Sequence, residues 1–211
     1  MDIPTRQQAD NYLDGASNNN PGLWVDHSIQ VAESAERIAA AHSELDPENA
    51  YILGLLHDIG RREGIAGMRH VIDGYNFLIA EGYADAARIC LTHSYPIADV
   101  NAVSSPWDGS TNERKFIAKY LKKIEYTTYD RLIQLCDAIC LPTGPVLMEK
   151  RLLDVTLRYG PNNFTTRKWQ AFFDIQKEFE KAIGQSIYHL SLIHISEPTR
   201  PPSTSRMPSS A

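Results

Sequence analysis

The sequence predicts an all-α protein, and three observations support this class. Apolar residues recur at helical spacing through most of the chain. Residues that commonly begin or end helices separate these stretches. No stretch shows the sustained apolar and polar alternation of a half-buried strand. With 211 residues, of which 43% are hydrophobic, the chain is long enough to bury one core, so we expect a single-domain helical bundle.

Each expected helix of the first third has its own signals. Thr5 can cap a helix that runs to about Ser17, where "NNNPG" breaks it. The next helix is expected from Leu23 to His42. Asp46-Pro47-Glu48 then supplies a capping carboxylate, a proline at the first helical position and an acid in the first turn. The apolar run that follows is expected to end at Gly60.

The rest of the chain continues this pattern. Further helices are expected at about 70–81, 84–93, 112–123, 129–139, 145–159 and 165–183. The proline-containing loop 94–110 lies between two of them and is expected to shape a pocket. "LPTG" breaks the pattern before residue 145.

Charge and cysteine content limit the class of function. A net charge of -5 and a pI of about 5.8 do not favour binding to nucleic acid polymers. Small phosphorylated molecules remain possible, because a metal ion can reverse the local charge. Cys90, Cys136 and Cys140 are expected to be reduced thiols. The polar N-terminus and the lack of a long apolar run predict a cytoplasmic protein without a membrane partner. The sequence predicts no oligomeric state.

The segment from Leu190 onward differs in character from the rest. It is rich in proline, serine and threonine, which predicts disorder. "LSLIHISEPTR" also resembles the conceptual translation of a sequencing adapter. We therefore exclude residues 190–211 from the fold and discount His194 as a ligand.

Six side chains in the remaining chain could share a metal ion. Four histidines lie at or near helical segments with an apolar face, one aspartate follows one of them directly, and another lies within "LIQLCDAICL". These are His27, His57, Asp58, His70, His93 and Asp137. A buried carboxylate needs a partner, a proton or a metal, and Asp137 has no lysine or arginine nearby in the sequence. The alternative is a set of structural core histidines. Imidazole and carboxylate ligands suit Zn, Mn, Fe, Co or Ni.

The order of these residues resembles the HD domain superfamily of metal-dependent phosphohydrolases. "DHSIQVAESAERIA" is similar to its first helix, "LLHDIGR" to its signature and "LIQLCDAI" to its last ligand-bearing helix. The resemblance covers about Trp24 to Ile139. It implies a metal-binding core at 24–140, preceded by a helix and turn at 1–23 and followed by helices at 141–189 that pack on it.

The resemblance also implies roles for these residues. His27, His57 and Asp137 would bind one divalent ion. His70 and His93 match the two extra histidines of binuclear members and would bind a second, with Asp58 as the bridge.

The implied reaction is hydrolysis of a phosphate ester, in a nucleotide or another small phosphorylated metabolite, by a metal-activated water. Asp58 and Arg61 would be the catalytic residues. Arg61, with Arg62, would bind phosphate oxygens, although a solvated turn is an equal alternative for both arginines. A mixed-valent di-iron oxygenase and a non-catalytic nucleotide-binding sensor are the alternative functions.

Overall fold

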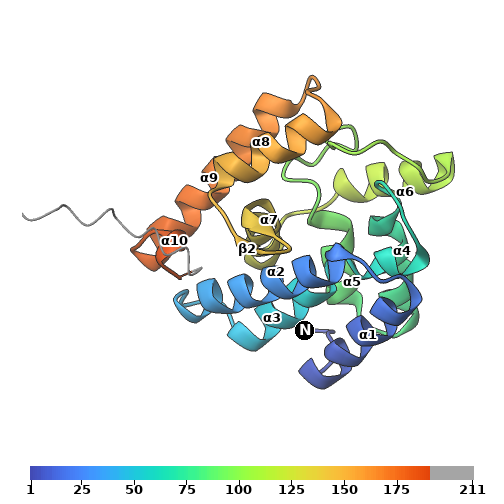
Figure 1. The fold of residues 1–211 in the computed structure, drawn as a ribbon, viewed down its shortest axis with the longest axis horizontal. Coiled ribbons are helices and arrows are strands. Elements are labelled where there is room, and N and C mark those ends of the chain that lie inside the picture. The colour runs from blue at the N-terminus through green and yellow to red at the C-terminus, as the bar shows by residue number, and fades with distance from the viewer. Residues whose placement is uncertain (191–211) are drawn as a thin grey trace, which may run out of the picture.

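Helices form nearly all of the secondary structure in the computed structural model, which describes residues 1–190 (Figure 1). The α-helices are α1 (Arg6–Asn19), α2 (Leu23–Ala40), α3 (Pro47–Leu56), α4 (His70–Ala80), α5 (Ala84–Thr92), α6 (Thr111–Leu121), α7 (Thr128–Ile139), α8 (Met148–Tyr159), α9 (Thr165–Ile183) and α10 (Ile187–Leu190). A 3-10 helix, η1 (Ile59–Glu63), follows α3. The all-α prediction is confirmed.

The predicted helix starts agree with the caps in the structure. Thr5 and Gln8 form a reciprocal capping box at the start of α1. The Asp46 side chain accepts a hydrogen bond from the backbone N–H of Asn49, with Pro47 as the first residue of α3. These local interactions determine where each helix begins.

Two predicted boundaries are wrong. The helix that was expected to end at Gly60 ends at Leu56, and Gly60 lies inside η1. The helix that was expected to begin at Pro145 begins at Met148. Pro145 instead belongs to a two-residue strand, β2 (Gly144–Pro145), which pairs antiparallel with β1 (Cys140–Leu141) around "LPTG". This short hairpin turns the chain from α7 into α8.

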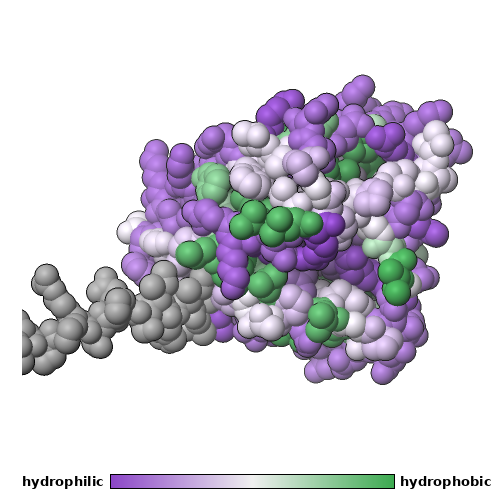
Figure 2. Space-filling model, turned by 45° about the horizontal axis from the view of Figure 1, so that its top comes forward, coloured by the Kyte–Doolittle hydropathy of each residue, from purple (hydrophilic) through white to green (hydrophobic). Residues whose placement is uncertain are grey.

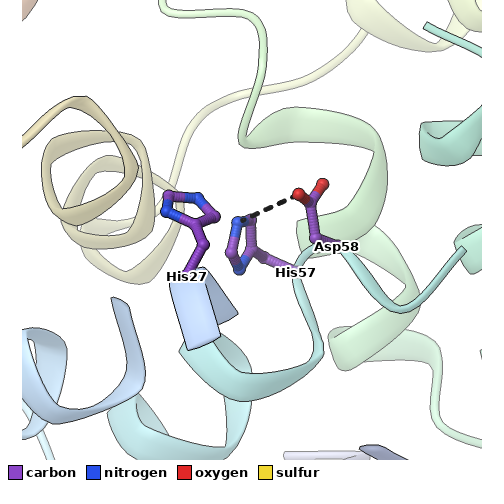
Figure 3. Close-up of side chains that lie close together, drawn as sticks. All are labelled: His27, His57 and Asp58. Carbon is purple, nitrogen blue, oxygen red and sulfur yellow. Dashed lines mark ion pairs between the residues drawn. The ribbon is translucent and has the colours of Figure 1, made fainter. Parts of the chain in front are cut away.

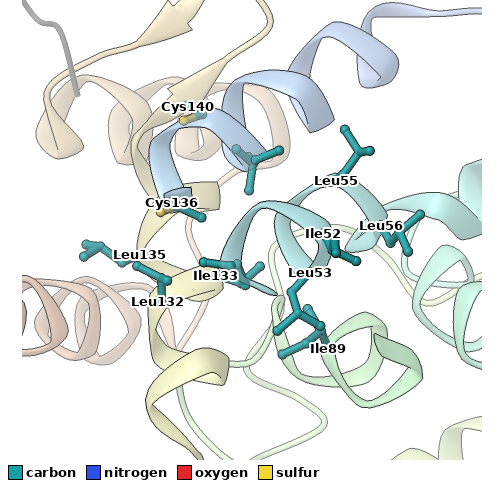
Figure 4. Close-up of a cluster of buried hydrophobic side chains, with 14 of the residues drawn as sticks. Ile52, Leu53, Leu55, Leu56, Ile89, Leu132, Ile133, Leu135, Cys136 and Cys140 are labelled. Carbon is teal, nitrogen blue, oxygen red and sulfur yellow. The ribbon is translucent and has the colours of Figure 1, made fainter. Parts of the chain in front are cut away.

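The main hydrophobic core lies where α2, α3, α5 and α7 meet (Figure 4). Its centre is built from fully buried aliphatic side chains such as Leu53, Ile89 and Ile133. Ile175 of α9 and Ile187 of α10 belong to the same core. The C-terminal helices therefore pack against the elements that carry the predicted ligands, and both α8 and α9 contact α7.

A smaller core forms between α4, α5 and α6, around Val71, Leu91 and Ile117. Hydrophilic residues dominate the face drawn in Figure 2, and its hydrophobic residues form separate patches. Within residues 1–190, no helix combines the length and the apolar character needed to cross a membrane. The prediction for the tail, residues 190–211, includes His194. Of these residues the structure describes only Leu190, so the rest of this prediction lies outside the described residues.

Candidate metal centre

The structure brings all six predicted ligand residues together from five parts of the chain. His27 lies in the first turns of α2, the His57-Asp58 pair follows α3, His70 begins α4, His93 follows α5 and Asp137 lies near the end of α7. Their ligand atoms form three overlapping groups, in each of which all atoms lie within 4.8 Å of one another. The groups are His27, His57 and Asp58; His57, His93 and Asp137; and Asp58, His70 and His93.

The end of α3 explains how two adjacent residues reach one cluster. His57 keeps helical backbone angles, with φ -57° and ψ -35°. Asp58 leaves the helix with φ -105° and ψ 13°. On a regular helix neighbouring side chains point about 100° apart. Because the chain turns at this point, His57 and Asp58 lie on the same side, and Nε2 of His57 is 3.9 Å from Oδ2 of Asp58 (Figure 3).

Glycines allow the segments that carry the ligands to approach closely. A Cβ atom on Gly60 would lie 2.0 Å from the carbonyl oxygen of His70 and 2.4 Å from the nitrogen of Gly74. A Cβ atom on Gly54 would lie 2.8 Å from Cα of Ala32, where α3 crosses α2. Gly60 is therefore required for the contact between η1 and α4, which brings His70 to Asp58.

Three histidine rings are anchored to backbone carbonyls of their own segments. Nδ1 lies 2.7 Å from the oxygen of Gly54 in His57 and 2.5 Å from the oxygen of Gly67 in His70. In His93 the corresponding distance, to the oxygen of Ile89, is 3.2 Å. A carbonyl oxygen can only accept, so each Nδ1 carries the hydrogen. In a neutral ring Nε2 then has a free lone pair, which is the arrangement typical of metal-ligating histidines.

The two oxygens of Asp58 face different neighbours. Oδ1 lies 3.1 Å from Nε2 of His70 and 3.5 Å from Nε2 of His93. Oδ2 faces His57 and accepts a hydrogen bond from Nε of Arg61 at 2.6 Å. Asp58 thus lies between the His57 side and the His70 side of the cluster.

Several acceptor atoms in the cluster face one another without a hydrogen between them. Nε2 of His70 and Nε2 of His93 are 3.4 Å apart. Among the described residues, His57 Nε2 and Asp58 Oδ1 are buried without a hydrogen-bond partner. An unpaired buried polar atom is costly, and acceptors that face each other repel. A divalent cation would satisfy both atoms, so the residues present fit a metal ion.

Burial and neighbouring charges shift the ionisation of these groups. Burial lowers the pKa of His57 to about 4, and it also lowers the pKa of His70. Burial alone would raise the pKa of Asp58, but Arg61 and the surrounding imidazoles hold it well below its usual range. Burial opposes protonation of His93, yet the neighbouring Asp58 carboxylate raises its pKa. The cluster therefore favours neutral imidazoles at His57 and His70 beside an ionised Asp58 carboxylate, whereas His93 holds a proton more readily than these two.

Asp137 and His27 form the more open side of the cluster. Nε2 of His27 and Oδ1 of Asp137 are 3.0 Å apart. The Asp137 side chain is 25% exposed, whereas that of Asp58 is 6% exposed. Burial acts against ionisation of Asp137, but the hydrogen bond with His27 holds the pKa of the carboxyl far below its usual range. Small molecules would therefore reach the cluster from the Asp137 side.

The two arginines after the HD pair have different surroundings. Arg61 donates from Nε to Asp58 and from Nη1 to the oxygen of Ala66 at 3.3 Å, and it lines the cavity next to the cluster. The guanidinium of Arg62 lies over the ring of Phe77, 4.1 Å from its centroid. The expectation that Arg62 contacts a phosphate is therefore not supported by its position.

A cavity of about 520 Å³ opens over the cluster, a size typical of small-molecule sites. Pro96, Ser104 and Ser105 of the predicted pocket loop line it. Side chains of α8 and α9, among them Arg151 and Lys168, form another part of its wall. No local sequence pattern points to these two residues, because a basic residue on an amphipathic helix usually faces solvent. Ser94 was also missed; its hydroxyl lies 2.9 Å from Nε2 of His93.

The fold and the cluster define an all-α protein with a buried histidine and aspartate site suited to divalent metals. The family model of the HD domain matches residues 24–140, more than half of the chain. The chain therefore belongs to the HD domain family, which lies in a superfamily of mainly metal-dependent phosphohydrolases. Comparison with curated proteins and with solved structures gave no match.

Proposed function

We propose that this protein is a metal-dependent phosphohydrolase that cleaves a phosphate ester of a small metabolite, with the six clustered side chains as the ligands of two divalent ions. One observation carries the proposal. Buried acceptor atoms, including His57 Nε2 and Asp58 Oδ1, converge beside a cavity of small-molecule size. Positive charge among these acceptors would stabilise such an arrangement.

The position of Asp58 supports two ions rather than one. One carboxylate oxygen faces His57 and the other faces His70 and His93. His27 and Asp137 complete the His57 side. This division of its oxygens supports a bridging role for Asp58.

Bound divalent ions would supply Lewis acidity toward the phosphate and a water of lowered pKa as the nucleophile. The protein's own groups position the reacting parts. Arg61 holds Oδ2 of Asp58 and so orients the carboxylate, and its side chain lines the cavity, where it can bind a phosphate oxygen. The carbonyl anchors fix the imidazole rings of His57 and His70, so that their Nε2 atoms would be available to bound ions.

Metal analysis and a phosphatase screen test this function. Purified protein should contain about two divalent ions per chain and release inorganic phosphate from nucleotides or sugar phosphates. Asp58→Ala should lose both metal and activity. Asp26→Asn is the matched control, because Asp26 is exposed and adjoins His27 in the sequence; it should keep both.

The same screen separates the alternatives. Turnover with manganese or nickel under anaerobic conditions supports hydrolysis. Turnover that requires iron and oxygen would contradict it, and tight nucleotide binding without turnover over the whole metal panel would also contradict it. Full phosphatase activity in Asp58→Ala would refute the role given to this residue.

A further inference from the structure

Lys168 is a buried cation in the wall of the cavity. It lies in the first turns of α9 and is only 6% exposed. Its Nζ donates a hydrogen bond to Oγ of Ser104 at 2.6 Å, across the contact between α9 and the loop 94–110. Both residues line the cavity that opens over the metal cluster.

Lys168 differs from the arginines that line the same cavity, because each of these is paired with a carboxylate. The pairs are Arg61 with Asp58, and Arg151 and Arg158 with Asp154. Over residues 1–190, no acidic group forms a salt bridge with Lys168, whose ammonium instead donates a hydrogen bond to the neutral Ser104 hydroxyl. A buried ammonium without a counter-ion is costly. A bound anion would supply the missing opposite charge.

The electrostatics of Lys168 also set it apart from the metal cluster. Burial lowers the pKa of Lys168 to about 8, and neither Asp58 nor Asp137 contributes a compensating rise. The first turn of α9 contains no acidic residue, so the positive end of the helix adds to the field. The cavity therefore contains two separate candidate sites for anions, one at the metal cluster and one at Lys168.

We propose that Lys168, together with Ser104, binds a second anionic group of the substrate, so that the preferred substrates are phosphate esters with a further phosphate or similar anion at their other end. This inference rests on the proposed function. It also places substrate selection on α9, beyond the matched residues 24–140. A compact monoester without a second anion would leave the charge of Lys168 uncompensated.

Selectivity between matched probes tests the inference. Alkyl phosphates would be compared with the terminal bisphosphates of the same chain, from propane to hexane, by phosphate release. At the best chain length we expect kcat/KM to favour the bisphosphate by roughly 10- to 100-fold in the unmodified protein, and this ratio to fall to near one in Lys168→Met. Lys177→Met is the matched control, since Lys177 is an exposed lysine on the same helix; its ratio should stay unchanged.

Equilibrium binding keeps this inference distinct from the proposed function. Calorimetry with the corresponding alkane bisphosphonates and monophosphonates requires no turnover. If neither these probes nor the nucleotides and sugar phosphates of the screen are hydrolysed, but bisphosphonate affinity falls about 10-fold or more in Lys168→Met, the hydrolase proposal fails and the Lys168 site stands. If probes are hydrolysed but neither selectivity nor bisphosphonate affinity depends on Lys168, the site is refuted and the hydrolase proposal stands.

Discussion

Replacing Lys168 with methionine should stabilise the folded protein at neutral pH. The ammonium group is buried beside a neutral hydroxyl, so folding removes it from water without an ionic partner among the described residues. Methionine has a similar length and carries no charge, so it removes this penalty and retains most of the packing. A surface lysine would show no such gain.

The magnitude follows from the pKa of Lys168. A fall from the usual 10.5 to about 8 corresponds to about 3 kcal/mol when the lysine is charged in both states. Because the folded-state pKa lies below the unfolded-state value, the unfolded chain binds more protons between these two pH values. Stability of the unmodified protein therefore rises with pH across this interval, whereas the variant lacks this rise. Water that enters the cavity reduces the effect, so we expect a gain of about 1–3 kcal/mol.

Urea denaturation measures the difference directly. Lys168→Met and the unmodified protein would be compared at about pH 7 and about pH 10, both with a chelator so that metal occupancy is equal. The variant should be more stable at the lower pH, and the gap should narrow at the higher pH. Lys177→Met should match the unmodified protein at both values. A Lys168→Met protein that is less stable at neutral pH, or a gap that does not depend on pH, would refute the reasoning.

Four further predictions concern the fold and the metal cluster. Gly60→Ala should cost more than about 3 kcal/mol and abolish metal binding, because its Cβ would collide with backbone of α4. Gly15→Ala, in open space within α1, should instead stabilise by about 0.5–1 kcal/mol in denaturant titrations. Arg88→Met should cost about 3–5 kcal/mol, since it leaves the carboxylate of Asp130 buried without its guanidinium partner; double replacement with Asp130→Asn should recover part of this loss. Removal of metal by a chelator should lower the melting temperature, and added manganese should restore it; an unchanged melting temperature would count against a metal in the cluster.

The sequence was sufficient for most of the fold because its signals are local. Helical periodicity and caps such as Thr5 and Asp46 depend on a few neighbouring residues, and the structure contains them as predicted. The role of Gly60 was misjudged for the opposite reason. Its constraint comes from the backbone of α4, which packs against it in three dimensions. No local pattern distinguishes that contact from a helix end.

The candidate site, like the fold, could be predicted only in part from the sequence. The six clustered residues were identified because histidines and aspartates in apolar helices are chemically conspicuous, and their assignment as metal ligands stays a prediction. Lys168 and Ser104 carry no such signal. A lysine on an amphipathic helix and a serine in a polar loop usually face water. Only the packing of α9 against the loop 94–110 brings them to one cavity.

The carbonyl anchors of His57, His70 and His93 have a consequence for the thermodynamics of metal binding. Each ring is held by an oxygen three or four residues earlier in its own segment, so its orientation is set when that segment folds. The loss of side-chain rotamer freedom, up to about 1–2 kcal/mol for a flexible side chain, then belongs to folding. An incoming ion meets ligands that are already ordered. Metal affinity should therefore increase with the stability of the surrounding helices. Substitutions that destabilise α3 or α4 should weaken metal binding even when they replace no ligand residue.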